Sequence, residues 1–228
     1  LANDESAPGA KAAPLTWPGL HGLFLAPIAD FFVRNGRFAM FLLSFIALYR
    51  LSDITMGIMA NPFYLDLGYT KLQIANIAKG LGFALSILGS FLGGVLVVRW
   101  GVLMTLLIGG VAVALTNLLF ALLALTEPNL VWLALIIGAD NLSGGIAATS
   151  FIAYLSSLTH TAYTATQYAL FSSLMTLPGK FTSGFSGIAV DAFGYPLFFV
   201  GAGVLGVPAI VMVLYLVHRE RTTLLDHR

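Results

Sequence analysis

The chain has 228 residues, of which 58% are hydrophobic and only 9% are charged. A soluble domain carries about 25% charged residues, so this composition excludes a water-soluble globular domain and indicates a membrane protein. The formal net charge of +1 leaves no basic surface for nucleic acid. Because the chain has no cysteine and its four histidines show no ligand spacing, we predict neither a metal site nor a cofactor.

The sequence of the N-terminal region indicates two segments. Residues 1–18 are rich in Ala, Pro and Gly and lack the basic start and apolar core of a signal peptide, so they predict a disordered linker end. Residues 20–33 are apolar on both sides of a break at Pro27 and too short to cross a bilayer. We therefore predict an interfacial segment over residues 19–37.

Six apolar stretches follow, each long enough to cross the hydrocarbon core, which takes about 20 helical residues. They predict an all-α membrane protein with a transmembrane bundle over residues 38–217 and a cytoplasmic tail over residues 218–228. The predicted spans are Phe38–Asn61, Gln73–Val98, Val102–Leu125, Leu130–Ser156, Thr166–Ala189 and Pro196–Val217. The turn signals between them lie at Asn61-Pro62, Gly68, Arg99-Trp100-Gly101, Glu127-Pro128-Asn129 and Asp191–Pro196.

Loop charges predict the orientation, because Lys and Arg gather on the cytoplasmic side of short loops. Only Lys71 falls in a loop on the side opposite the termini. Both termini are therefore predicted to be cytoplasmic. The basic residues on the side of the termini are Arg34, Arg37, Arg99, Arg219, Arg221 and Arg228.

Ionisable side chains inside a membrane span are costly, so they are functional candidates by default. The order of two polar spans and one charge-free span occurs twice along the chain. Such symmetry is typical of the 3+3 inverted repeat of a transporter half, in which the charge-free helices face lipid and the polar helices line a cavity. The polar candidates are Arg50, Asp53, Lys79, Asp140, Asn141, Gln167 and Lys180.

The candidate carboxylates are Asp53 and Asp140. Asp53 lies three residues after Arg50, so the two side chains share a helical face and can pair. The pair is either a structural ion pair or, as we favour at this depth, a proton site at Asp53 beside an anion clamp at Arg50. Asp140 is predicted as a second proton-coupling site, with a salt bridge to a lysine as the alternative.

The cations suggest an anionic substrate. Lys79 and Lys180 with Arg50 would give a cavity three positive charges, and we predict that they bind substrate together with Asn141 and Gln167. The alternatives are that Lys79 snorkels to the headgroups and that Asn141 makes an interhelical hydrogen bond.

Small residues recur at every fourth position in the second and fifth spans. This spacing predicts close helix packing, on surfaces that rocking of two bundles would also use. The residues are Gly82, Ser86, Ser90 and Gly94, and Gly179, Ser183 and Gly187.

No enzyme is predicted, since the chain has neither a phosphate-binding loop motif nor a dinucleotide fingerprint. An intramembrane aspartyl protease built on Asp53 and Asp140 is disfavoured. Asp140 lacks the preceding glycine that those enzymes use, and Arg50 would hold Asp53 ionised when the dyad needs one protonated carboxyl.

Five segments carry a resemblance to a known family. They are Leu48–Asp53 (LYRLSD), Asn61–Ile74, Asp140–Leu158 (which contains DNLSGG), Thr164–Leu170 (TATQYAL) and Asp191–Phe199. In collinear order they resemble the C-terminal half of AmpG-type muropeptide permeases, which belong to the major facilitator superfamily. The segment from Gly93 to Gly101 resembles the loop signature of that superfamily, which implies a conformational role for Gly94, Arg99 and Gly101.

The resemblance implies proton-driven import of anhydro-muropeptides, which are peptidoglycan turnover products, across the bacterial inner membrane. A chain that begins without Met is expected to be a fragment, with residues 1–33 as the end of the linker to a missing N-terminal six-helix half. That half would be lost by truncation or form a separate chain. The alternatives are a superfamily transporter of another anionic solute, such as a peptide, nucleotide or acyl-CoA, and a non-transporting fragment.

Overall fold

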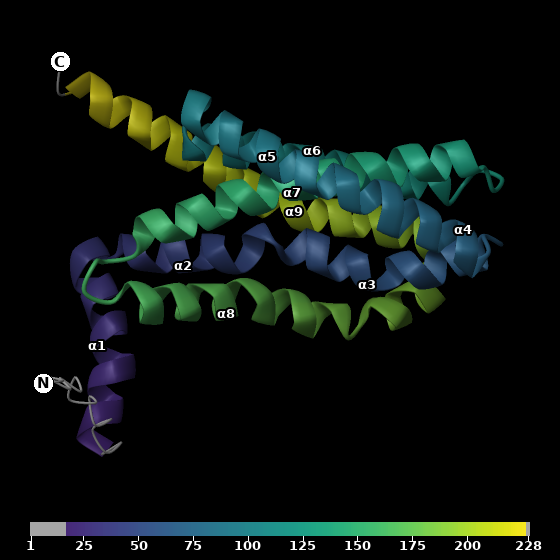
Figure 1. The fold of residues 1–228 in the computed structure, drawn as a ribbon. Helices are drawn as coiled ribbons and strands as arrows, with labels where there is room; N and C mark the ends of the chain where they lie inside the picture. The colour runs from purple at the N-terminus through teal and green to yellow at the C-terminus, as the bar shows by residue number, and fades with distance from the viewer. Residues whose placement is uncertain (1–16, 227–228) are drawn as a thin grey trace, which may run out of the picture.

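The computed structural model describes residues 17–226, and side chains over residues 25–222. Every regular element in this part is a helix (Figure 1), which confirms the predicted all-α class for the described residues. The elements are α1 (Trp17–Asn35), α2 (Phe38–Tyr49), α3 (Leu51–Asp66), α4 (Lys71–Ala75), the π-helix η1 (Asn76–Gly82), α5 (Phe83–Trp100), α6 (Val102–Leu123), α7 (Leu130–Leu158), α8 (Thr164–Ser183) and α9 (Ser186–Asp226).

Five helical segments are long and apolar enough to cross a membrane. They correspond to the predicted spans one to four and six, so the chain is a multi-pass membrane protein. Their bounds are Phe38–Asp66, Lys71–Trp100, Val102–Leu123, Leu130–Leu158 and Ser186–Thr222.

The predicted fifth span, Thr166–Ala189, falls mostly on α8, which is not among those five segments. Ser and Thr residues, together with Gln167 and Lys180, lower the mean hydropathy of α8. The helix nevertheless runs along both α2 and α3 (Figure 1). A sixth span is therefore a proposal, taken up below.

Glycines with positive φ end several of the helices. Gly68, Gly101 and Gly194 have φ values of 95°, 85° and 76°, which suit a residue without a Cβ. They confirm the predicted turns, and Gly194 divides α9 into two helices. The predicted break at Asn61-Pro62 is wrong, because α3 continues through Pro62 to Asp66. Membrane helices tolerate such prolines where neighbouring groups satisfy the freed backbone.

The N-terminal helix α1 lies across one end of the bundle, at a steep angle to the long helices (Figure 1), and contacts α2 and α8. The predicted break at Pro27 is wrong, since α1 passes through it. The linker over residues 1–18 falls almost wholly outside the described residues, and the interfacial placement of residues 19–37 stays a prediction. In the predicted tail, α9 continues as far as Asp226.

Two apolar clusters occupy opposite ends of the bundle. Residues 50–55 separate the two clusters in the first span. Residues 114–119 separate them on α6, and residues 138–146 separate them on α7. Arg50, Asp53, Asn117, Asp140 and Asn141 fall in this gap, so the fold gathers them into one middle layer. One cluster includes Phe45, Tyr49 and Phe151, and the other includes Phe63, Phe120 and Phe199.

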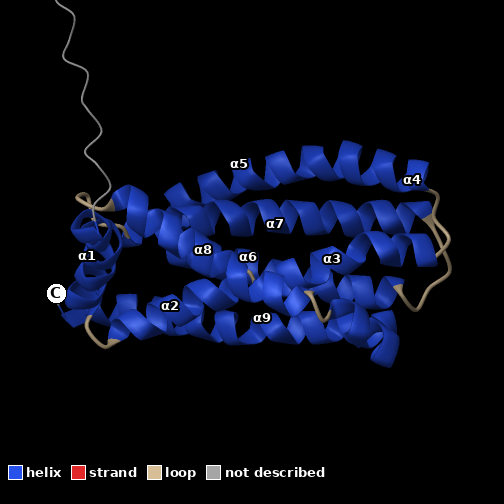
Figure 2. Cartoon of the chain, turned by 90° about the horizontal axis from the view of Figure 1, so that it is seen from below, coloured by secondary structure: helices blue, strands red, loops and turns tan. Residues whose placement is uncertain are grey.

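The two charge-free spans are α6 and the later part of α9, and their facing lipid stays a prediction. α6 packs between α7 and α9, and 44% of its most apolar stretch is buried. The second span (Lys71–Trp100) has the lowest buried share of its most apolar stretch, 17%. Its helix α5 lies at one edge of the bundle beside α7 (Figure 2). Of these five segments, the second span therefore leaves the largest share of its apolar stretch free for lipid or another helical bundle.

Glycines bring α5 and α7 into backbone contact. A Cβ at Gly89 would lie 2.2 Å from the Leu142 carbonyl oxygen, and a Cβ at Gly145 would lie 2.5 Å from the Ser86 carbonyl oxygen. This confirms close packing at the second span. The prediction of close packing is wrong at Gly94, the last small residue of the series in the second span, because nothing lies within 4 Å of a Cβ there.

Gly145→Ala is expected to destabilise the bundle by about 1–3 kcal/mol, because the new methyl meets backbone atoms that have no room to move. The measurement is thermal unfolding of the purified chain in detergent. Gly144→Ala is the matched control, since nothing lies within 4 Å of a Cβ there. Equal unfolding temperatures for the two variants would contradict the packing.

Candidate functional site

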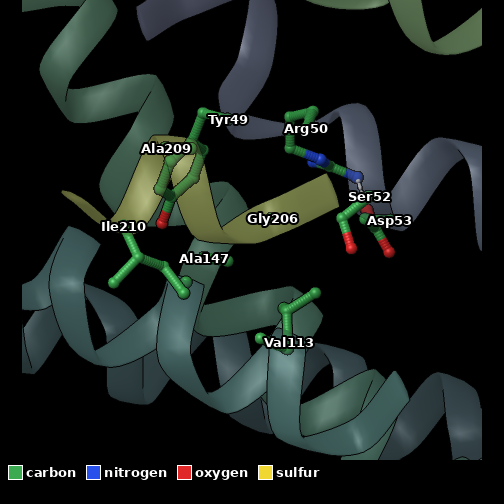
Figure 3. A pocket seen from close by; sticks show the side chains of 11 residues that line it. Tyr49, Arg50, Ser52, Asp53, Val113, Ala147, Gly206, Ala209 and Ile210 are labelled. Carbon is green, nitrogen blue, oxygen red and sulfur yellow. Dashed lines mark hydrogen bonds and ion pairs between the residues drawn. The ribbon is translucent and has the colours of Figure 1, made fainter. Parts of the chain in front are cut away.

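Arg50 lies at a break in the first span. α2 ends at Tyr49 and α3 begins at Leu51, and Arg50 between them has φ −97° and ψ 1°, outside the helical range. Its guanidinium forms an ion pair with Asp53, and Figure 3 shows the two side chains pointing toward one another. The pair predicted from the spacing is confirmed. Transporters place substrate and ion sites at such discontinuities in membrane helices.

The Arg50–Asp53 pair is partly exposed. The two side chains are 26% and 25% exposed. The two side chains also border a cavity between α3, α6, α7 and α9, which is lined largely by small side chains (Figure 3). This cavity has room for water but is too small for a sugar or peptide. A solute larger than water would therefore meet the pair at its exposed atoms and not inside the cavity.

Ser52 fixes the start of α3 to two neighbouring helices. Its buried hydroxyl donates to the carbonyl oxygen of Ala202 on α9 at 2.6 Å. It also accepts from the side-chain amide of Asn117 on α6 at 2.7 Å. These bonds hold α3 at the point where the span is broken.

Asp140 lies on α7 within the same middle layer. The hydroxyl of Thr116 on α6 is 3.1 Å from Oδ1 of Asp140 and 2.9 Å from the carbonyl oxygen of Val113. Within residues 25–222 no cation pairs with Asp140, so the salt bridge considered as the alternative is not formed in this structure. A charge at this depth is costly without such a partner.

The two candidate lysines are exposed and have no hydrogen bond or ion pair among the described side chains. Lys79 lies in the π-helix η1, a form that is rare and frequent at functional sites. Lys180 follows Gly179, where a Cβ would come within 2.7 Å of Ile54. That contact places Lys180 on the helix next to Asp53, at a similar level along the bundle.

Asn141 lies where η1 meets α7. Its side-chain amide donates to the carbonyl oxygen of Ile137 in its own helix at 2.8 Å, so the alternative of an interhelical hydrogen bond is not formed. The same amide nitrogen lies 3.1 Å from the Cβ position of Gly82. Asn141 thus sits about one helical turn from the level of Lys79.

Gln167 is placed away from the Arg50–Asp53 pair. The side chain is 1% exposed and donates to the Pro27 carbonyl oxygen at 2.9 Å and to Asp30 at 3.0 Å. It accepts from Arg34 at 3.3 Å and from the backbone N–H of His160 at 2.7 Å. In this structure Gln167 ties α8 to α1 and to the loop between α7 and α8.

Gln167→Leu is expected to release α1, because the similar-sized apolar side chain removes all of these bonds at once. The measurement is tryptic cleavage after Arg34 and Arg37 in the purified chain, and we expect a rate about tenfold higher than in the parent. Ser173→Ala is the control, since that exposed hydroxyl bonds only within α8. Equal cleavage of the two variants would show that Gln167 does not hold α1.

The residues of the predicted conformational loop lie at the junction of α5 and α6. Arg99 is exposed near the end of α5, and Gly101 makes the turn. Gly94 lies earlier in α5, before Arg99, and nothing lies within 4 Å of a Cβ there. Within the described residues, none of the three forms a side-chain hydrogen bond or ion pair with the middle layer, and their role stays a prediction.

Three polar residues of the middle layer were not predicted from the sequence: Ser52, Thr116 and Asn117. All three are buried. The adjacent Thr-Asn pair inside a span without charges was the available signal, because an amide buried in a membrane helix needs a partner.

Three known proteins show what this chain is similar to. It is 36% identical over 190 residues to the transporter AmpG 4 of Rickettsia conorii, 83% of this chain and 45% of that protein. It is 34% identical to AmpG 1 of Rickettsia prowazekii, over 81% of this chain and 42% of that protein. It is 30% identical to the anhydromuropeptide permease of Escherichia coli, over 83% of this chain and 38% of that protein. No protein-family model matches the chain.

The chain is a homologue of the AmpG-type permeases. It spans less than half the length of the curated relatives it matches. These AmpG relatives are named as transporters or a permease, which are not enzymes. The resemblance read from the five sequence segments is thereby confirmed, in a chain whose helices form a membrane bundle.

Proposed function

We propose that this chain is the C-terminal six-helix half of a proton-coupled permease that imports anhydro-muropeptides into the cytoplasm. The observation that carries the proposal is the match to AmpG-type relatives over 83% of the chain. The middle layer supports it, because the Arg50 side chain is partly exposed at the break in the first span. Muropeptides carry carboxylates, for which Arg is a suited partner.

The six-helix half requires α8 to span the membrane. Its 20 residues and its course along α2 and α3 support this, since those two helices together make one span. A polar helix is acceptable there if its polar face meets protein or water rather than lipid. The second half would pack against the exposed faces of the second span and α8. The 3+3 repeat, cytoplasmic termini and inner-membrane location are part of the same proposal.

In this proposal, Asp53 and Asp140 carry the proton, and Arg50, Lys79, Asn141 and Lys180 contact the substrate. The packing of Gln167 gives it a supporting role at the α1 end. Gly94, Arg99 and Gly101 would act when the two halves move. The partners are therefore a muropeptide, a proton, the N-terminal half and the bilayer.

The test is uptake of labelled anhydro-muropeptide by cells that lack their own permease. The cells express this chain joined to the N-terminal half of an AmpG-type permease, and the N-terminal half alone is the control. We expect uptake that unlabelled anhydro-muropeptide competes away and that an unrelated dipeptide does not. No uptake by a well-expressed, correctly inserted protein would overturn the proposed substrate.

A further inference from the structure

The charge-free helix α6 carries two adjacent buried polar side chains, Thr116 and Asn117, which are 5% and 0% exposed. The hydroxyl of Thr116 lies 3.1 Å from Oδ1 of Asp140 on α7. The amide of Asn117 donates to Ser52 on α3 at 2.7 Å. One dipeptide therefore contacts both segments that bear the candidate carboxylates.

Helix geometry explains how neighbouring residues reach different helices. Successive side chains on an α-helix are rotated by about 100°. Thr116 consequently faces α7 while Asn117 faces α3. Ser52 lies between Arg50 and Asp53 in the sequence, so the bond from Asn117 fixes the segment that carries the ion pair.

Packing alone does not account for Asn117. Its side-chain oxygen is buried and has no hydrogen-bond partner within the described residues. An unsatisfied buried oxygen costs stability, whereas a leucine of similar size would fill the same space without that cost. The amide is therefore better explained by the bond it makes to Ser52.

We propose that Thr116 and Asn117 are positioning residues that link Asp140 to the Arg50–Asp53 segment through α6. A displacement of α7 at Asp140 is transmitted through this dipeptide to the broken start of α3. This inference rests on the proposed function, because it assigns the coupling between the proton site and the substrate site to α6.

The test separates coupling from binding in proteoliposomes that contain the joined permease. Exchange of labelled for unlabelled anhydro-muropeptide reports binding and movement, while accumulation driven by a pH gradient also requires coupling. Thr116→Val is expected to lower accumulation at least about tenfold and to change the half-saturation concentration for exchange less than about twofold. Thr116→Ser, which keeps the hydroxyl, is expected to restore accumulation.

Thr105→Val is the matched control. Thr105 is also fully buried on α6, but its hydroxyl bonds to Gly101, at the start of that helix. If Thr116→Val and Thr105→Val accumulate equally, or if Thr116→Ser fails like Thr116→Val, the inference is wrong. A wild-type permease that shows neither exchange nor accumulation would instead overturn the proposed function.

A double-mutant cycle tests the second contact, using the half-saturation concentration for exchange. Asn117→Leu and Ser52→Ala are each expected to raise it about fivefold, and the double variant no further than either single change. Additive effects would show that Asn117 does not act through Ser52 and would overturn its role.

Discussion

The Asp53→Asn variant of the joined permease is expected to lose uptake of anhydro-muropeptide, down to the level of cells without a permease. Asp53 is the carboxylate that pairs with Arg50, and both side chains are partly exposed at the break in the first span. Its loss removes a proposed proton site and leaves the guanidinium without its partner. The measurement is the initial rate of uptake in cells. Asp191→Asn, at an exposed position, is the control and should leave the rate unchanged.

Stability distinguishes a functional pair from a structural one. Removing one member of a partly buried ion pair is expected to cost about 1–3 kcal/mol, less than for a fully buried pair because solvent screens the charges. The double variant Arg50→Gln with Asp53→Asn should recover most of that stability and still fail to transport. Recovery of both stability and uptake in the double variant would show that the pair is only structural.

Asp140→Asn is expected to abolish accumulation against a gradient while substrate exchange continues. Asp140 contacts Thr116 and has no cation partner within the part of the chain that the structure describes. The amide keeps the shape of the side chain and an oxygen that accepts from Thr116, but it does not take up or release a proton. The measurement is accumulation and exchange in the same proteoliposomes.

The control for Asp140→Asn is Glu127→Gln, which changes an exposed loop carboxylate. Accumulation should stay at the parent level in this variant. If Asp140→Asn accumulates substrate normally, Asp140 is not a proton-coupling site.

Local patterns in the sequence were sufficient to predict most of the spans and the Arg50–Asp53 pair. Apolar stretches of span length and glycines at turns are local features, as are residues three apart on a helix. The break predicted at Pro62 is absent because neighbouring groups in a membrane bundle compensate for the missing N–H of proline. Hydropathy indicates the fifth span least strongly, because the polar residues of α8 lower its mean hydropathy.

Contacts between distant segments were not predictable in the same way. The bonds of Gln167 to α1 join residues more than 130 positions apart, and its polarity alone suggested a cavity position. The bond from Asn117 to Ser52 joins two spans with no charge in either side chain. The position of Gly89, rather than Gly94, against α7 depends on the helix rotation that packing sets.

The most direct test of the central claim is accumulation of labelled anhydro-muropeptide in proteoliposomes that contain this chain joined to the N-terminal half of an AmpG-type permease. The interior is set alkaline relative to the outside, and the measurement is repeated with a protonophore. We predict accumulation above the external concentration that the protonophore abolishes. Accumulation that is insensitive to the protonophore, or no accumulation of this substrate by a correctly inserted protein, would contradict the proposed proton-coupled import.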